Sequence, residues 1–167
     1  SHFQQQGYFE TKVTTTVQQE PSGETIVYTI DKGPRHKVSD IDIVGNQARS
    51  EKDLMGHVKV AQAHFFSHGS YSEQLVRQSV NNLKKVYQAD GYSDVKVTPQ
   101  VKTEPNGNIE VAFHIQEGPQ DKVETMHVVG NNTMPPDKLV PGGLKLGPGQ
   151  PYSQKLVDDD RNRILQT

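Results

Sequence analysis

Histidine is the side chain with the most obvious capacity for chemistry in this sequence, which has seven histidines and no cysteine. His57, His64 and His68 lie close together along the chain. His64 and His68 have the i, i+4 spacing at which two imidazoles on one helix can bind zinc. The residues between them are typical of a loop, however, and no nearby carboxylate completes a ligand set. We therefore expect a solvated loop here and no metal site.

The acidic run from Asp158 to Asp160 has the composition of a hard-cation site, but it falls within the first turns of a predicted helix. Acidic side chains in that position complement the helix dipole and face solvent, so we expect no cation there. The chain also has no phosphate-binding loop, no dinucleotide-binding glycine motif and no serine nucleophile motif. The sequence thus predicts neither an enzyme nor a cofactor site. Zinc chemistry at the three histidines is the enzymatic alternative.

Composition and charge exclude further classes of protein. The 18 basic and 20 acidic residues give a net charge of −2, and basic residues form only short patches such as Arg35–Lys37, so nucleic acid is not an expected partner. No apolar run exceeds three residues, whereas a membrane-spanning helix needs about 20. The hydrophobic share of 32% is low for a globular chain even when glycine is counted. A single thick core is therefore not expected.

The sequence repeats itself with a period close to 85 residues. Lys32-Gly33-Pro34 returns as Glu117-Gly118-Pro119, and Gly45-Asn46 returns as Gly130-Asn131. Apolar and aromatic positions recur at nearly the same spacing in these pairs: Tyr8 and Tyr92, Ile26 and Val111, Tyr28 and Phe113, Val38 and Val123, Ile41 and Met126, Tyr71 and Tyr152. A period of this length indicates tandem copies of one structural unit.

One complete unit runs from Lys32 to Gln116 and predicts the order β-α-α-β-β. Apolar alternation indicates strands over 37–44, 92–101 and 109–115. A short helix over 51–57 and a longer one between Ser72 and Gly91 follow from their capping residues and apolar spacing. We expect an α+β fold: a three-stranded mixed sheet in the spatial order one, three, two, built as a split β-α-β unit and covered by two helices.

These landmarks resemble the POTRA (polypeptide-transport-associated) repeat, which BamA-type outer-membrane assembly factors carry in tandem. The resemblance rests on the following residues: Gly33-Pro34 and Gly118-Pro119, Gly45-Asn46 and Gly130-Asn131, Tyr71 and Tyr152, Tyr87, and Gly91-Tyr92. It implies tandem POTRA repeats on the periplasmic side of the outer membrane of a Gram-negative bacterium, followed by a β-barrel. A two-partner secretion transporter and an organellar import pore are alternatives within this class.

The period divides the chain into one whole unit and two half-units. Residues 1–31 correspond to the C-terminal hairpin of one POTRA repeat, 32–116 to a complete repeat, and 117–167 to the N-terminal half of a following repeat. Together the two halves have about the length of one period. They could form a further unit within one chain, if the first and third strands are antiparallel neighbours, or by exchange in a swapped dimer.

The resemblance implies unfolded outer-membrane proteins, accessory assembly lipoproteins and the outer membrane as partners. Strand two is an edge strand in the expected sheet, and its unpaired backbone can accept a client strand by β-augmentation. The predicted client-binding residues are Tyr92, Ser93, Asp94, Val95, Lys96, Val97 and Thr98, with Leu83 and Tyr87 lining an apolar groove. Pro99 limits pairing beyond them. The rival hypothesis is a structural array that docks folded partners, such as lipoproteins or a cell-division protein.

Overall fold

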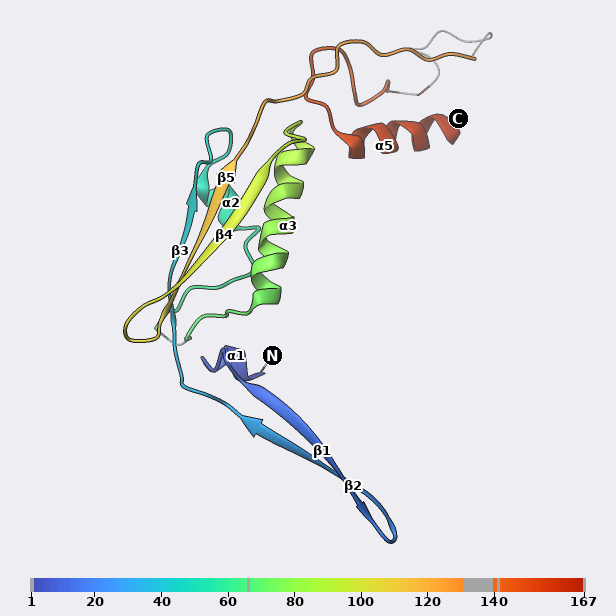
Figure 1. Cartoon of the computed structure of the whole chain (residues 1–167). Helices are drawn as coiled ribbons and strands as arrows, with labels where there is room; N and C mark the ends of the chain where they lie inside the picture. Colours follow the sequence, from blue (N-terminus) through green and yellow to red (C-terminus); the bar gives the residue numbers. More distant parts are fainter. Residues whose placement is uncertain (1, 66, 131–139, 141, 167) are drawn as a thin grey trace.

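The computed structural model describes residues 2–65, 67–130, 140 and 142–166 of the 167-residue chain. In chain order the elements are α1 (His2–Gln5), β1 (Lys12–Glu20), β2 (Gly23–Asp31), β3 (Val38–Val44), α2 (Glu51–Met55), α3 (Glu73–Ala89), β4 (Lys96–Thr103), β5 (Ile109–Gln116) and α5 (Gln154–Leu165). Strands β3 to β5 with α2 and α3 form a central unit, with the β1–β2 hairpin and α5 at its two ends (Figure 1). The expected α+β class is confirmed.

The central sheet has the strand order β3-β5-β4, as predicted. Strand β5 pairs in parallel with β3 and antiparallel with β4. Alternate side chains of the middle strand are buried beneath the helices. The core contains these residues of β5, α2 and α3: Ile109, Val111, Phe113, Ile115, Leu54, Val76, Leu83 and Tyr87. The helices thus cover one face of the sheet and leave the other to solvent.

The predicted antiparallel pairing of the first and third strands is wrong, because β3 and β5 are parallel. After α2 the chain returns along β3 to its start, where Ala63 N–H donates to the Val38 carbonyl (2.8 Å) and Val38 N–H donates to the His68 carbonyl (3.0 Å). Helix α3 therefore begins beside the start of β3 and runs in the same direction. Strand β4 must then run back and β5 forward.

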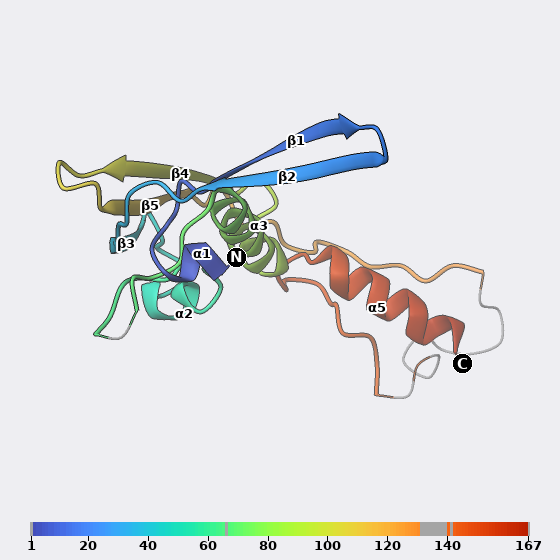
Figure 2. The ribbon, with the colours of Figure 1, turned by 90° about the horizontal axis from the view of Figure 1, so that it is seen from below.

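The connection between α2 and α3, which returns along β3, is referred to below as the return segment. Because of it β3 and β4 are antiparallel, whereas the predicted split β-α-β arrangement requires them to be parallel, so that prediction is wrong. The return segment further means that the chain enters the central unit at one end of the sheet and leaves at the other. The β1–β2 hairpin and α5 project from these opposite ends, and Figure 2 shows them as separate arms. The antiparallel pairing on which we based closure of the two half-units within one molecule is therefore absent.

Helix boundaries follow the predicted capping residues. The hydroxyl oxygens of Ser50 and Ser72 accept hydrogen bonds from the Asp53 and Leu75 N–H groups, at 3.3 and 3.1 Å. Gly91 has a φ of +88°, the left-handed conformation expected after a helix. Such caps satisfy N–H groups that the first turn of a helix leaves without partners.

The second strand begins later than predicted. Tyr92 N–H donates to the Tyr87 carbonyl (3.0 Å) and Val95 N–H donates to the Tyr92 carbonyl (3.3 Å), so residues 92–95 form the turn that leads out of α3. The strand starts at Lys96 and continues to Thr103. The sequence-based strand over 92–101 is therefore displaced toward its C-terminal end.

The C-terminal half-unit differs from expectation at Asp160. This side chain is buried, with 6% of its surface exposed, although we expected it to face solvent. Its two carboxylate oxygens accept the N–H groups of Lys145 and Leu146, at 2.8 and 2.9 Å. The repeat aligns Asp160 with Ser79, whose hydroxyl oxygen accepts Lys59 N–H at 2.8 Å. In both copies a buried polar side chain on a helix holds the preceding loop.

None of the helices among the described residues has the length and apolar character needed to cross a membrane.

In the C-terminal half-unit, Gly130 has the expected left-handed conformation, with φ of +85°. Its predicted partner in the turn, Asn131, lies outside the described residues.

Candidate functional site

Strand β4 forms one edge of the central sheet, with no strand beyond it in the described part of the chain. Glu104 N–H donates to the Asn108 carbonyl (2.8 Å) and fixes which residues of β4 face β5. Because backbone groups alternate in an antiparallel ladder, the even-numbered residues of β4 bond to β5. The backbone groups of Val97, Val101 and Thr103 therefore point outward, as does the carbonyl of Pro99.

The predicted client-binding residues divide into two groups. Lys96, Val97 and Thr98 lie on β4, whereas Tyr92, Ser93, Asp94 and Val95 lie in the turn before it. The free edge also extends beyond the predicted residues, to Thr103. Apolar alternation indicated the buried face of this strand correctly, but it carries no information on where the ladder with β5 begins.

The predicted groove residues Leu83 and Tyr87 are not at the surface. Both side chains are 0% exposed and belong to the core, so they cannot contact a client. The groove beside β4 lies at the other end of α3 and is lined by these residues: Gln4, Phe9, Glu10, Tyr71, Ser72, Glu73, Gln74, Val101, Thr103 and Ile109. Phe9 and Tyr71 meet edge to face there, with ring centroids 5.8 Å apart. Burial raises the pKa of the Tyr71 phenol.

The opposite edge of the sheet, β3, is partly occupied. The two hydrogen bonds of Val38 to the return segment cover its start. The Gln62 side-chain amide donates to the Ser39 carbonyl (2.8 Å) and to the Asp40 carboxylate (3.2 Å). Acidic side chains at Asp40 and Asp42 are exposed farther along. Strand β4 is therefore the more accessible edge for an added strand.

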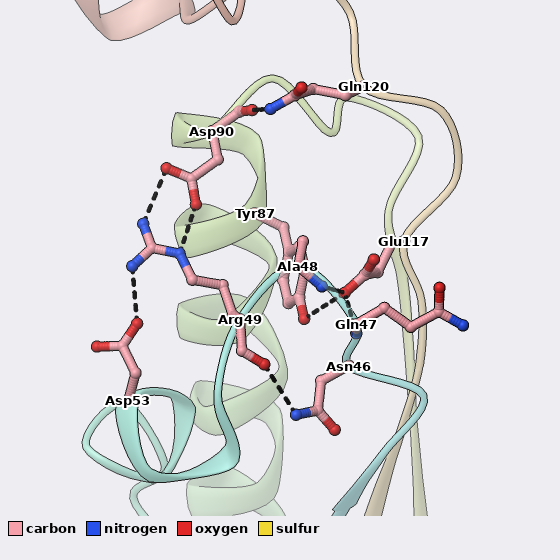
Figure 3. Close-up of polar contacts among 9 residues, drawn as sticks. All are labelled: Asn46, Gln47, Ala48, Arg49, Asp53, Tyr87, Asp90, Glu117 and Gln120. Atoms are coloured by element: carbon pink, nitrogen blue, oxygen red, sulfur yellow. Dashed lines mark hydrogen bonds and ion pairs between the residues drawn. The ribbon is translucent and has the colours of Figure 1, made fainter.

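A polar cluster at the end of the central unit fixes the chain that leaves it. One carboxylate oxygen of Glu117 accepts Gln47 N–H (2.7 Å), Ala48 N–H (2.8 Å) and the Tyr87 hydroxyl (2.9 Å), as Figure 3 shows. Burial and the hydrogen bond to Glu117 raise the pKa of Tyr87. The residue after β5 is thus tied to both the loop after β3 and the end of α3.

An arginine completes this cluster. Arg49 binds Asp90 through two nitrogens, at 2.6 and 2.9 Å, and Asp53 through a third, at 2.7 Å (Figure 3). Hydrogen bonds to Asp90 and then Asp53 raise the pKa of the guanidinium. The Gln120 side-chain amide donates to the Asp90 carbonyl at 2.9 Å. Two-pronged guanidinium pairing of this kind fixes orientation as well as supplying attraction. We call this set, residues 46–49, 53, 87, 90, 117 and 120, the exit junction.

The corresponding place at the start of the central unit uses different side chains. The repeat aligns Phe3, Tyr8 and Lys32 with Tyr87, Tyr92 and Glu117. The Lys32 ammonium lies 5.8 Å from the ring centroid of Phe3 and 5.6 Å from that of Tyr8. A cation over aromatic rings therefore stands where the exit junction has a carboxylate and a hydroxyl. We call residues 3, 8 and 32 the entry junction.

The histidines are not arranged as a metal site. His64 lies in a tight turn with reciprocal backbone hydrogen bonds to Ser67, and not on a helix. Burial and the nearby Arg35 lower the pKa of His68. Across residues 2–65, 67–130, 140 and 142–166, no three histidine or carboxylate side chains group closely enough to hold a metal ion.

Sequence reasoning did not identify Glu117 or Arg49 as positioning residues. A Glu-Gly-Pro run is common in turns and does not by itself indicate a role for the glutamate. The groups that donate to Glu117 lie 70, 69 and 30 residues earlier in the chain, so no local pattern connects them to it. The repeat did carry a signal. Tyr87 and Glu117 change together to Phe3 and Lys32 between the two copies, as expected for residues in contact.

Comparison with known families finds a matching sequence family. Residues 36–118 match POTRA, described as "Surface antigen variable number repeat". The matched segment nearly coincides with the complete unit that the internal period predicts.

Curated relatives match over a larger part of the chain. The chain is 24% identical over 165 residues to "Outer membrane protein assembly factor BamA" of Neorickettsia risticii, covering 98% of this chain and 22% of the relative. It is 26% identical over 144 residues to "Putative outer membrane protein assembly factor" of Treponema pallidum, covering 83% and 17%. The chain thus spans only about a fifth of the length of these relatives.

Among solved structures, POTRA3-5 of Haemophilus influenzae BamA resembles this chain with a TM-score of 0.55 at 16% identity. The match covers 99% of this chain and 65% of that one. At this identity the likeness establishes the fold, including its tandem arrangement, and nothing further.

Proposed function

The chain carries a POTRA domain over residues 36–118, and on that premise we propose that it is a periplasmic part of an outer-membrane protein assembly factor. In this role its β4 edge binds unfolded outer-membrane proteins by β-augmentation. The names of the curated relatives support the class of protein. The observation that carries the binding site is the row of outward backbone groups along β4, beside an open groove.

Backbone pairing suits an unfolded client because every extended polypeptide offers the same N–H and C=O groups. The edge supplies outward N–H donors at Val97, Val101 and Thr103, with one donor missing at Pro99. A client strand beside β4 would point alternate side chains toward the helix side of the sheet, into the groove between Val101 and Tyr71. Affinity then comes from the backbone and weak selectivity from the groove.

The same assignment implies accessory lipoproteins as partners and a barrel that anchors the protein in the outer membrane. A two-partner secretion transporter or an organellar import pore would use the β4 edge in the same way on other clients. A purely structural docking array differs physically, because it would bind folded partners tightly and have no affinity for unfolded peptides.

The direct test is a titration with an extended peptide from a strand of an outer-membrane protein, followed by amide chemical shifts and amide hydrogen exchange. We expect the amides of Val97, Val101 and Thr103 to shift and to gain protection. The β3 amides from Asp40 to Val44 serve as the internal control. A response confined to β3 would mean that the other edge receives the client, and no response at either edge would favour the docking array.

Substitutions at one outward position sharpen this test. Val101→Pro removes an outward donor without touching the ladder to β5, and should weaken peptide binding about five- to tenfold. Val101→Thr keeps the N–H and is the matched control, with binding within about twofold. Pro99→Val restores a missing donor and should tighten binding. Equal affinities for all three variants would contradict backbone pairing at β4.

A further inference from the structure

The groove beside β4 contains two carboxylates and no basic side chain. Glu10 and Glu73 line it together with the edge-to-face rings of Phe9 and Tyr71. Lysine, arginine and histidine are absent from its lining in the described part of the chain. Glu10 forms no ion pair with any described residue. We call this cavity of about 500 Å³ the β4 groove. Its lining offers aromatic rings and a carboxylate without a counter-charge.

Glu73 adds a second negative charge at the start of α3. Its ion pair with Arg77 is 3.3 Å long, and the two side chains are 84% and 69% exposed. An ion pair as exposed as this one contributes little to stability, so another cation can replace Arg77 at small cost. The charge of Glu73 also acts inside the groove, since burial and then this charge raise the pKa of the Tyr71 phenol. The groove is therefore electronegative.

The internal repeat shows that the fold does not require acids at this place. It aligns Glu73 and Gln74 with Gln154 and Lys155. The corresponding cavity, between the end of α3 and the start of α5, is lined by Lys155 and also by Lys85. No carboxylate lines that cavity in the described part of the chain. Two cations thus stand in one copy where two acids stand in the other, so the acids of the β4 groove belong to this boundary and not to the fold.

A client strand would place side chains within reach of these acids. A strand added to β4 lies about 4.8 Å from it, and its side chain beside Val101 points to the helix side, toward the groove. Strands of outer-membrane barrels alternate apolar and polar side chains, so one face of each such strand is polar. A long basic side chain on that face would lay its aliphatic stem over Phe9 and Tyr71 and bring its charge to Glu10 and Glu73.

We propose that the β4 groove selects client strands that carry lysine or arginine on the side facing the helices. The proposal rests on the binding of clients at β4 proposed above, and adds what that binding distinguishes. Backbone pairing alone leaves the client free to shift along β4 in steps of two residues. A basic side chain held in the groove fixes one of these registers, and a carboxylate in the same position is repelled by both acids.

Peptide titration tests the selectivity. Three extended peptides of alternating apolar and polar residues would differ only at one central polar-face position, which is lysine, methionine or glutamate. We expect the lysine peptide to bind the 167-residue chain about fivefold more tightly than the methionine peptide, and the glutamate peptide about fivefold more weakly. Equal affinities, with weaker binding of all three to Val101→Pro, would overturn the selectivity and leave pairing at β4 intact. Absence of binding by every peptide would overturn both.

Charge reversal locates the selectivity in the groove. Glu10→Lys should invert the order of the lysine and glutamate peptides. Glu24→Lys makes the same change of net charge at the start of β2, in the hairpin that projects away from the central unit (Figure 1), and should keep the original order. An inverted order in both variants would show that net charge acts at long range, and an unchanged order in both would show that Glu10 takes no part. Either result contradicts the proposal.

Proton shifts of the peptide report where the basic side chain lies. Protons above an aromatic ring resonate upfield, so the side-chain methylene protons of the lysine should move upfield on binding. Tyr71→Leu keeps an apolar side chain at the groove and should remove most of this shift. A lysine that binds with unshifted methylene protons would contradict its placement over Phe9 and Tyr71.

Discussion

The entry and exit junctions share one backbone path and differ in their side chains. Gly7 and Gly91 have φ values of +87° and +88°. At the entry His36 N–H donates to the Gly7 carbonyl (2.9 Å), and at the exit Asp121 N–H donates to the Gly91 carbonyl (2.7 Å). The repeat aligns these residues. The path from one unit to the next is therefore set by a glycine and one backbone hydrogen bond at each junction.

The side chains determine how firmly each path is held. At the exit, Glu117 binds two backbone N–H groups and a buried tyrosine. At the entry, Lys32 lies over two half-buried rings and is itself exposed. The hydrogen bond from the buried Tyr87 hydroxyl is costly to remove, and the exposed Gln47 and Ala48 N–H groups add two charge-assisted bonds. An exposed cation over a ring contributes little. The entry and exit junctions thus share a backbone geometry but hold it with different firmness. The difference comes from two side-chain positions, Phe3 and Lys32 at the entry and Tyr87 and Glu117 at the exit.

The largest effect is expected from Gly91→Ala. A Cβ at this position would lie 2.6 Å from the Asp121 carbonyl oxygen, in a left-handed conformation, and should destabilise the central unit by about 2–4 kcal/mol. Urea unfolding with hydrogen exchange of the α3 and β5 amides measures this. Gly7→Ala meets the His36 oxygen at the same 2.6 Å, but it lies outside the central core. Equal loss of protection in α3 from both variants would contradict the comparison.

The next effect is expected at Glu117. Glu117→Ala leaves two backbone N–H groups and the Tyr87 hydroxyl without their acceptor, which should cost about 2 kcal/mol in the free energy of unfolding. Glu117→Gln keeps an acceptor oxygen without the charge and should lose about half as much. Residual dipolar couplings across residues 117–121 should also show a looser exit path in the alanine variant. An unchanged unfolding curve would mean that solvent replaces the carboxylate freely.

Tyr87→Phe copies the entry residue into the exit junction and removes one of these hydrogen bonds, at a cost of about 1 kcal/mol. Burial and Glu117 raise the pKa of the Tyr87 phenol in the folded protein. The phenol thus stabilises the folded state fully below about pH 10, and this contribution is lost as the pH rises further. We expect wild-type stability to fall more steeply above pH 10 than that of Tyr87→Phe. Parallel pH profiles of the two proteins would refute this assignment.

The smallest effect is expected at the entry junction. Lys32→Met removes the cation and keeps an unbranched apolar chain over Phe3 and Tyr8, so stability should change by about 0.5 kcal/mol or less. Thermal unfolding in low and high salt measures it. A loss as large as that of Glu117→Ala would show that the two junctions are equally firm.

Local sequence patterns predicted most of the fold. Ser50 and Ser72 identified both helix starts, because a capping hydroxyl acts on N–H groups two or three residues away. Alternation from Ile109 to Ile115 identified the buried middle strand. The internal period predicted a unit over 32–116, and the family match over 36–118 nearly coincides with it. Each of these signals is carried by neighbours in sequence or by comparison of two copies.

Long-range relations could not be predicted in the same way. The direction of β5 relative to β3 depends on the return segment, whose contacts at Val38 come from residues 63 and 68 in an apparently featureless loop. The burial of Leu83 and Tyr87 depends on which side of α3 the sheet covers most closely. The candidate edge was predicted as a strand but placed four residues early, because Val95 in the turn continues the alternation of Val97 and Tyr92 adds an apolar residue ahead of it.

The parallel direction of β3 and β5 has a consequence for any longer series of such units. In such a series the chain enters each unit at one end of its sheet and leaves at the opposite end. Each added unit would therefore extend the series by about 25 Å, the length of an eight-residue strand. The β4 edges of successive units would then be regularly spaced along the series. With clients bound at β4 as proposed above, a polypeptide released from one edge would meet the next after a fixed step, and the number of units would set the distance between the first edge and the last.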